Sequence, residues 1–381
     1  MPKTYEKINE KIKNGDAIVV TAEEMIKFVE NEGIKVAAEE IDVVTTGTFG
    51  PMCSSGAFLN FGHSDPPIKF EHIWLNDVRA YHGNAAVDCY IGCSKMSDKY
   101  PFKYGGGHVI EDLVSKKPIR LRGDSYVTDC YPLSEVETEF TIDEINQAIL
   151  CNPRNAYQRY ICAVNSSAKT LYTYMGKLLP YFGNAHFSGA GCLNPLSNDP
   201  DYETIGIGTR IFLGGGIGYV IGEGTQHNPR NSMGTIFVKG NLKQMTPEFL
   251  RGVSYEKYGT SMLVGVGIPI PILNEGLAKK TAVRDEDILT DVVDYGILRR
   301  ERPILKQVTY KELKSGYFEL KGKKIKCSSL SSISKSRKIA EILKLWIQKG
   351  KFFLNPPAET LPLEKDLKPM KQKLNLNLIK N

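Results

Sequence analysis

One cysteine stands in a stretch that is rich in turn-forming residues. Residues 47–69 read GTFGPMCSSGAFLNFGHSDPPIK, with Cys53 among glycines and serines and His63 ahead of a Pro-Pro turn. Structural cysteines behave as small apolar side chains, whereas reactive thiols lie where backbone N–H groups and polar side chains reach the thiolate. The context of Cys53 favours a reactive thiol. Histidine titrates near neutral pH, so His63 is a candidate proton donor, although a histidine that only caps a turn explains it equally well.

A second cysteine follows a segment with strand-like composition. Residues 120–132 read RLRGDSYVTDCYP, which predicts that Cys130 is presented where a strand ends and a turn begins. Arg120 and Arg122 precede it and could hold its thiol as the thiolate, which is the form that acts as nucleophile or sulfur carrier. The alternative is a buried structural thiol, because cysteine is among the most buried residue types.

The other six cysteines are predicted to be packed thiols. Cys89 and Cys93 are four residues apart, and on a helix they would share one face and could supply half of a metal or iron–sulfur site. No second pair has matching spacing, and an iron–sulfur cluster normally takes four thiolates. The sequence therefore predicts no metal site. The remaining cysteines stand alone: Cys151, Cys162, Cys192 and Cys327.

The composition is that of a globular protein. The chain has 381 residues, of which 41% are hydrophobic and 24% charged, and no apolar run is long enough to cross a membrane as a helix. The N-terminal segment is charged and amphipathic, unlike a secretion signal. Eight cysteines scattered through such a chain indicate free thiols in a reducing compartment, so we expect a cytoplasmic protein.

Positive charge is concentrated near the C-terminus. Residues 296–381 carry 21 Lys and Arg against seven Asp and Glu, although the whole chain has a net charge of only +6. This basic region is a solvated surface with a flexible tail or a docking face for an acidic partner. Nucleic acid is disfavoured, because neither an aromatic stacking motif nor zinc-finger spacing accompanies the basic residues.

Local patterns predict a mixed α/β fold. Thr21 with Glu24 forms a capping box ahead of one helix, Thr141 with Glu144 repeats it ahead of INQAIL, and apolar residues at helical spacing predict a helix over 334–350. Short β-branched runs predict strands: AIVV, DVVTT and GTIFVKG. We expect one large catalytic domain with glycine-rich loops over residues 1–355, followed by a short basic tail at 356–381.

Two glycine runs could bind an anion through their backbone N–H groups or could only allow tight turns and close packing of the backbone. They lie in YGGGHVIEDLV, residues 104–114, and in FLGGGIGYVIGEGTQHNPR, residues 212–230, and neither has the ending of a phosphate-binding loop. Tight turns and close backbone packing are the simpler interpretation, and a pocket for a small carboxylate is the alternative. Five arginines are available as carboxylate partners: Arg122, Arg154, Arg159, Arg210 and Arg230.

Several long motifs occurring in order resemble one family. TTGTFGPMCSSGAFLNFGHSDPPIK, YGGGHVIEDLV, LRGDSYVTDCYP and SRKIAEILKLWIQKGKFFLNPPAETLP are similar to the homocysteine biosynthesis family of methanogens and some anaerobic bacteria, over about residues 5–362. The resemblance implies a sulfurtransferase that makes homocysteine for methionine biosynthesis from L-aspartate semialdehyde and sulfide-level sulfur. It implies electrons from a small iron–sulfur ferredoxin-domain partner, with no cofactor on this chain. Longer relatives append nucleotide-binding CBS domains after the catalytic region, and we expect only the short basic tail here.

The same resemblance assigns roles to particular residues. The motif of the persulfide-bearing cysteine is matched by Cys130, and that of a second important thiol by Cys53. We expect Cys53 to resolve the sulfur, His63 to donate a proton to the departing oxygen, and Arg122 to contact the substrate. The basic C-terminal region is the expected docking face for an acidic ferredoxin-type protein, and the sequence allows a homo-oligomer. Two alternatives remain: a metal or iron–sulfur redox protein that uses Cys89 and Cys93, and a non-catalytic persulfide carrier.

Overall fold

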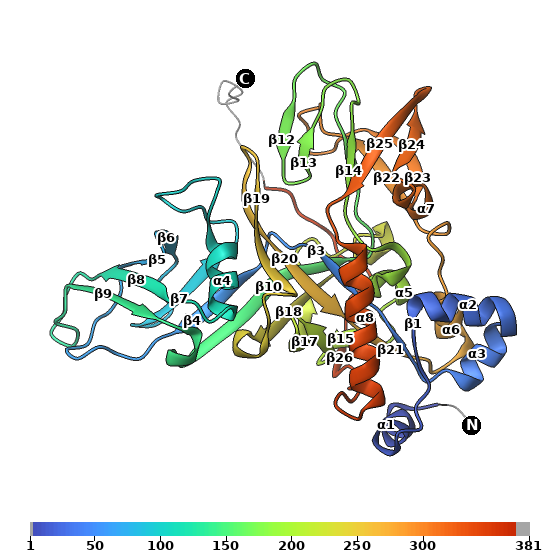
Figure 1. Ribbon diagram of the computed structural model, residues 1–381, viewed down its shortest axis with the longest axis horizontal. Coiled ribbons are helices and arrows are strands. Elements are labelled where there is room, and N and C mark those ends of the chain that lie inside the picture. The colour runs from blue at the N-terminus through green and yellow to red at the C-terminus, as the bar shows by residue number, and fades with distance from the viewer. Residues whose placement is uncertain (1–2, 371–381) are drawn as a thin grey trace.

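The computed structural model describes residues 3–370 and has the predicted mixed α/β composition (Figure 1). Part of the expected basic tail, residues 371–381, lies outside the described residues. Eight α-helices are present in the described part of the chain: α1 Tyr5–Asn14, α2 Ala22–Glu32, α3 Ile34–Glu40, α4 Gly106–Val114, α5 Pro195–Asn198, α6 Glu275–Thr281, α7 Tyr310–Lys314 and α8 Ile333–Gln348. None of these helices is long and apolar enough to cross a membrane.

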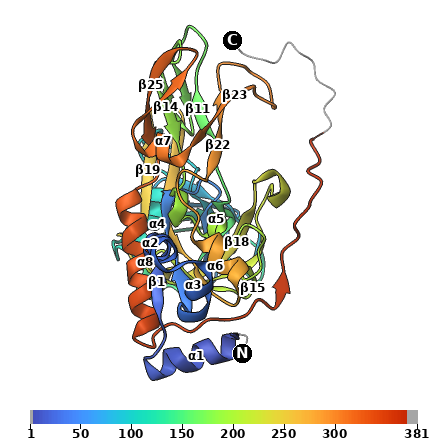
Figure 2. The same ribbon diagram turned by 90° about the vertical axis from the view of Figure 1, so that its right-hand side faces the viewer.

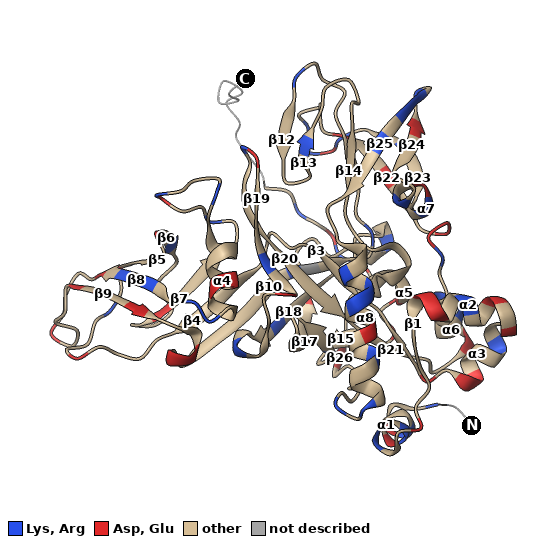
Figure 3. Ribbon diagram, in the orientation of Figure 1, with Lys and Arg blue, Asp and Glu red and all other residues tan. Residues whose placement is uncertain are grey.

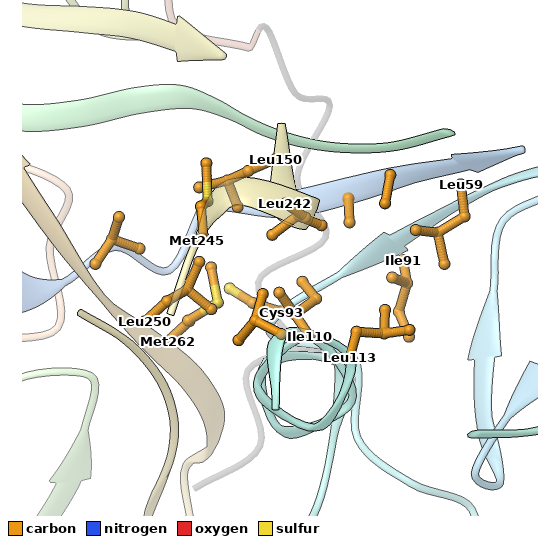
Figure 4. Close-up of a cluster of buried hydrophobic side chains, with 14 of the residues drawn as sticks. Leu59, Ile91, Cys93, Ile110, Leu113, Leu150, Leu242, Met245, Leu250 and Met262 are labelled. Atoms are coloured by element: carbon orange, nitrogen blue, oxygen red, sulfur yellow. The ribbon is translucent and has the colours of Figure 1, made fainter. Parts of the chain in front are cut away.

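An antiparallel sheet of nine strands forms the centre of the molecule. Its order is β19-β20-β16-β17-β18-β10-β4-β7, and β3 pairs with β20. The strands are β3 Thr48–Pro51, β4 Gly56–Asn60, β7 Asp88–Gly92, β10 Gln147–Tyr157, β16 Arg210–Leu213, β17 Gly216–Glu223, β18 Thr235–Asn241, β19 Leu250–Tyr255 and β20 Gly259–Gly267. Helix α4 packs on this sheet, and the largest hydrophobic core lies between them (Figure 4).

Three smaller sheets surround the central one. The sheet β6-β5-β8-β9 lies at the left of Figure 1, the sheet β23-β22-β11-β14-β25-β24 lies at its upper right, and β1-β2-β21 adjoins α2, α3 and α6. Their strands are β1 Val19–Thr21, β2 Val43–Thr45, β5 His72–Leu75, β6 Val78–Ala80, β8 Ile119–Asp124, β9 Glu135–Phe140, β11 Cys162–Val164, β14 Ala185–Phe187, β21 Pro269–Pro271, β22 Leu289–Asp294, β23 Ile304–Thr309, β24 Tyr317–Leu320 and β25 Lys323–Ser329. Two short ribbons complete the structure: β12 Leu171–Thr173 with β13 Gly176–Leu178, and β15 Gly206–Ile207 with β26 Glu359–Thr360.

Helix α8 ties the N-terminal elements to the central sheet. It contacts β1, β2, β3 and β20, and the chain after it runs extended up the opposite side of the molecule (Figure 2). Lys344 of α8 pairs with Glu24 of α2, and Ser336 accepts a hydrogen bond of 3.1 Å from the Phe49 backbone N–H. Because Phe49 belongs to β3, this contact fixes the strand that leads to Cys53.

Most of the local predictions are confirmed. The Thr21–Glu24 capping box begins α2, the three predicted strands form β1, β2 and β18, and α8 covers the predicted helix. The second glycine run forms the β16–β17 hairpin, where Gly214 and Gly215 have left-handed φ angles of 61° and 97°. In this run the glycines serve turn geometry, as the simpler interpretation predicts.

The predicted helix over INQAIL is wrong. The Thr141–Glu144 capping box forms, but it caps only the 3-10 turn Ile142–Glu144, and β10 begins at Gln147. In β10, Ala148 and Leu150 are buried on one face while the strand pairs with β4 on one side and β18 on the other. Pairing on both edges therefore outweighs the local helix signal.

Candidate functional site

The Cys53 turn is held by polar side chains. Cys53 lies between β3 and β4, and the backbone N–H of Ser55 donates to the Met52 carbonyl over 3.0 Å. The Ser54 hydroxyl donates to Oδ1 of Asn152 over 3.0 Å, and the Asn152 amide donates to the Ser55 hydroxyl. Asn152 is fully buried in β10. The turn is thus fixed to the central sheet, which orients the Cys53 thiol.

Cys89 and Cys93 are packed thiols, as predicted, but they do not lie on a helix. Cys89 is in β7, and Cys93 directly follows that strand and lies in the core beside α4 (Figure 4). Both are fully buried, and burial raises the pKa of each thiol. The Cys93 Sγ donates a hydrogen bond of 3.2 Å to the Cys53 carbonyl, so its role is to support the Cys53 turn.

Two small cavities adjoin the turn. Both are lined by Pro51, Tyr157, Tyr160 and Ser188, and one of them also by Cys53. Each has a volume of about 20 Å³, which is room for one water molecule. Among the described residues that line the two cavities there is no Asp or Glu. The thiol therefore faces an aromatic enclosure that has no acidic residue in its described lining.

Arg154 brings a positive charge to this thiol. Its backbone carbonyl accepts a hydrogen bond of 3.2 Å from the hydroxyl of Ser54, the residue after Cys53. Its guanidinium lies 5.9 Å from the centre of the Tyr157 ring, which lines the same cavity as Cys53. Burial alone would lower the pKa of Arg154, but Tyr157 and Cys53 outweigh it and the pKa stands above its ordinary value. One terminal nitrogen donates to Gln226, whereas the buried Nε finds no acceptor among the described residues. The sequence offered Arg154 only as one of five possible carboxylate partners, and the structure places it beside the Cys53 turn.

Tyrosine hydroxyls form a chain that leads away from the cavity. Tyr160 donates to Tyr174 over 3.1 Å, and the hydroxyls of Tyr174 and Tyr295 are 2.6 Å apart. Burial raises the pKa of Tyr160 and of Tyr295, so both stay protonated near neutral pH. Sequence reasoning missed this chain because its members come from separate segments without a shared motif.

Cys130 is exposed and lies in a loop. Strand β8 ends at Asp124, so the predicted strand end at Cys130 is wrong. Cys130 lies in a turn between Thr128 and Tyr131, within the connection 125–134 between β8 and β9. Just beyond the end of β8, the Ser125 backbone N–H donates to the Ser134 carbonyl over 2.8 Å, and this hydrogen bond closes the loop that contains Cys130. In this loop the Tyr131 ring stacks on the His63 ring with centroids 5.9 Å apart. The structure thus brings His63 close to the Cys130 loop.

Cys53 and Cys130 lie at opposite ends of β4. Cys53 precedes Gly56, whereas His63 and the loop it contacts lie beyond Asn60. A strand of this length spans about 17 Å. In Figure 1 the β8–β9 connection forms the left edge, and the β3–β4 turn lies nearer the middle. The described residues give no contact between the two thiols or between His63 and Cys53.

Arg122 lies on the four-stranded sheet in acidic surroundings. Its guanidinium stacks on Trp74 at 4.4 Å and lines an open groove of about 410 Å³ together with Asp124, Glu135 and Glu137. Asp124 also accepts a hydrogen bond of 2.8 Å from Nδ1 of His72, and neighbouring Glu71 completes a half-exposed group of three residues able to hold a metal ion. The groove around Arg122 therefore favours cations over a carboxylate substrate.

Much of the basic C-terminal charge is already paired. Lys338 contacts Glu248 and Lys314 contacts Asp285, in addition to the α8–α2 pair. A basic hairpin tip remains at the β24–β25 turn (Figure 3). It carries four exposed lysines: Lys321, Lys323, Lys324 and Lys326.

The resemblance seen in the sequence is confirmed by comparison with known proteins. Residues 17–354 match the model of a family described as homocysteine biosynthesis enzyme, sulfur-incorporation. The chain belongs to this family. It is 56% identical over 379 residues to an L-aspartate semialdehyde sulfurtransferase of Methanosarcina acetivorans, covering 100% of this chain and 76% of the relative. It is 55% identical to a protein of the same name from Methanocaldococcus jannaschii, over 98% of this chain and 76% of that one.

More distant relatives extend the family without naming an activity. An uncharacterized protein of Methanothermobacter thermautotrophicus is 32% identical over 320 residues, which is 81% of this chain and 71% of the relative. No solved structure matches this chain.

Proposed function

We propose that this chain is an L-aspartate semialdehyde sulfurtransferase. The proposal is supported by its similarity to two proteins of that name and rests on one structural observation, the Cys53 thiol beside Arg154 in an aromatic enclosure. The net reaction adds hydrogen sulfide at the aldehyde carbon, releases the aldehyde oxygen as water, and consumes two electrons and two protons. The product is homocysteine.

The two cysteines have separate roles in this proposal. Cys130 carries sulfur as a persulfide, for which its exposed loop gives access to a sulfur donor. Cys53 is the second thiol and works where the substrate binds. Thiol–persulfide exchange between them conserves electrons but requires the sulfur atoms to meet. Since they lie at opposite ends of β4, the exchange requires the 125–134 loop to move or a second copy of the chain to supply the persulfide.

Electrons come from an iron–sulfur partner of ferredoxin type, and this chain holds no cofactor for the purpose. Forming the persulfide from sulfide passes two electrons to the oxidised partner, and delivering its outer sulfur as a thiol takes four electrons from the reduced partner, so the net demand stays at two. The basic tip of the β24–β25 hairpin supports docking of an acidic protein. His63 lies beside the Cys130 loop, so it donates a proton to the departing oxygen when that loop moves to the substrate at Cys53. Arg122 is the weaker candidate for substrate contact because acidic residues surround it.

The reaction is tested by mass spectrometry of homocysteine made from L-aspartate semialdehyde, labelled sulfide and a strong reductant. The intact protein is compared with Cys130→Ala and Cys53→Ala, and with Cys151→Ala as a control thiol that is also partly exposed. We expect labelled homocysteine from the intact protein and the control, and loss of product from both other variants. Equal product from all four proteins would contradict the assigned roles.

A non-catalytic persulfide carrier is the second candidate, and the exposure of Cys130 favours it. Such a protein would take up labelled sulfur on Cys130 and pass it to another enzyme. It would become persulfidated when supplied with labelled polysulfide, whose sulfur is already at the persulfide level, yet make no homocysteine when substrate and reductant are added. The mass of the intact chain and the product analysis together separate the two functions.

A further inference from the structure

We propose that Arg154 binds the α-carboxylate of the substrate and thereby places the aldehyde carbon at Cys53. The identity of the substrate as a small amino-acid aldehyde rests on the proposed function. The recognition of a carboxylate at this thiol rests on the geometry of the site. Arg154 is therefore a substrate-binding residue that the family assignment does not supply.

The first support is the hydrogen-bonding state of the guanidinium. Its buried Nε finds no acceptor among the described residues, and one terminal nitrogen donates to the neutral side-chain amide of Gln226. Leaving a buried donor of a charged group without an acceptor is energetically costly. A carboxylate that accepts from Nε and a terminal nitrogen would satisfy the donor in the bidentate geometry that arginine favours.

The second support is the charge around the site. Arg159, five residues further along the chain, forms an ion pair with Asp291, and Arg230 forms one with Glu364. The positive charges of these two arginines are therefore already neutralised by carboxylates of the chain. The Arg154 guanidinium lies over the Tyr157 ring, and the two cavities that Tyr157 lines have no acidic residue in their described lining. An anionic ligand would therefore meet no repulsion there.

The third support is the proximity of Arg154 to the Cys53 turn, since the Ser54 hydroxyl donates to the Arg154 carbonyl over 3.2 Å and the guanidinium lies on Tyr157 of the Cys53 cavity. Only two carbon atoms separate the carboxylate from the aldehyde in L-aspartate semialdehyde, so a carboxylate held by Arg154 keeps the aldehyde within reach of Cys53. The present cavities of about 20 Å³ are smaller than the substrate. Binding must open them, and the Arg154–Gln226 hydrogen bond is the contact that the carboxylate would replace.

The test is protection of Cys53 from alkylation by iodoacetamide, followed by peptide mass spectrometry. L-Homoserine is the probe, because it has an alcohol in place of the aldehyde and cannot react. Its counterpart without the carboxylate, 3-aminopropan-1-ol, is the ligand control. Saturating homoserine should slow alkylation of Cys53 by about tenfold in the intact protein, and 3-aminopropan-1-ol should not.

Three variants make the test specific. Arg154→Gln should lose the protection, whereas Arg154→Lys, which keeps the charge without the bidentate fork, should retain part of it. Arg251→Gln, at an exposed arginine paired with Glu111, should be protected like the intact protein. Arg154→Lys keeps a long, positively charged side chain at this position. It therefore keeps the test valid if Arg154→Gln fails to fold.

The outcomes separate this proposal from the proposed reaction. Undiminished protection in Arg154→Gln, or no protection of the intact protein, would overturn the role of Arg154 even if homocysteine is made. Protection that depends on Arg154 in a protein that makes no homocysteine would uphold the carboxylate site and overturn the sulfurtransferase assignment.

Discussion

The Sγ atom of Cys93 lies 3.2 Å from the backbone carbonyl oxygen of Cys53 and donates a hydrogen bond to it. Cys93 is fully buried in the core beneath α4, so this bond joins the hydrophobic core to the candidate site. A cysteine that sequence reasoning treats as a packed thiol therefore also positions the reactive one.

Replacement of Cys93 should weaken both stability and turnover. Cys93→Ala removes the donor and leaves a small cavity, which should lower the free energy of unfolding by about 1–3 kcal/mol. Cys93→Ser keeps a donor for the Cys53 carbonyl and should retain more homocysteine formation per folded molecule. Cys89→Ala is the control, since it empties a similar core position without touching the turn. Equal losses of kcat in Cys93→Ala and Cys89→Ala would show that the bond does not matter.

Native alkylation should rank the cysteines by exposure and charge state. Cys130 is exposed and should react with iodoacetamide first, and Cys53 should follow. Cys89 and Cys93 should react only after unfolding, because they are inaccessible and burial raises the pKa of both thiols. Peptide mass spectrometry over time measures the order, and early modification of Cys93 would contradict the packing described here.

The sequence predicts those elements of the fold whose stabilising contacts lie between residues that are close together along the chain. The α2 capping box and the α8 periodicity involve neighbours along one helix, and both predictions hold. The INQAIL prediction fails because the two partner strands of β10 lie far away in the sequence.

At the candidate site, too, the sequence predicts the local features but not the contacts between distant segments. A turn rich in glycine and serine identifies Cys53, but its contacts with Arg154 and Cys93 depend on how strands pair across the central sheet. The same limit applies to the separation of Cys53 from Cys130, since motif spacing carries no information on distance in space. Pairing of that kind follows from tertiary packing rather than from any local pattern.

Buried thiols should make the protein less stable at alkaline pH. Burial raises the folded-state pKa of Cys89 above the unfolded value of about 8.5, so above that pH the unfolded state binds fewer protons than the folded state. The free energy of unfolding then falls as pH rises, by up to about 1.4 kcal/mol per pH unit for each such thiol. Guanidinium unfolding at pH 7.5 and 9.5 measures the slope. Cys89→Ala should reduce it, whereas removal of the exposed Cys130 thiol should leave it unchanged.

The glycines at the start of α4 should not tolerate a side chain. A Cβ at Gly106 would meet the Gly92 carbonyl, and one at Gly107 would meet the Ser261 carbonyl, so alanine at either position forces the helix away from the sheet. We expect a loss of about 1–3 kcal/mol in the free energy of unfolding for Gly107→Ala. Gly222→Ala is the control, because a Cβ there meets no atom within 4 Å. Similar stability of the two variants in thermal unfolding would contradict the close approach.

The tyrosine chain should deliver protons to the Cys53 cavity, because the reaction consumes two of them. Tyr174→Phe removes the central hydroxyl and leaves those of Tyr160 and Tyr295 without their shared partner. We expect a loss of about 1–3 kcal/mol in stability, a lower kcat with little change in KM, and a larger solvent isotope effect. Tyr258→Phe is the matched control, since its ring lies beside Tyr174 and its hydroxyl has no hydrogen-bond partner among the described residues. If the isotope effect is the same in both variants, the chain is structural and protons reach the cavity by another route.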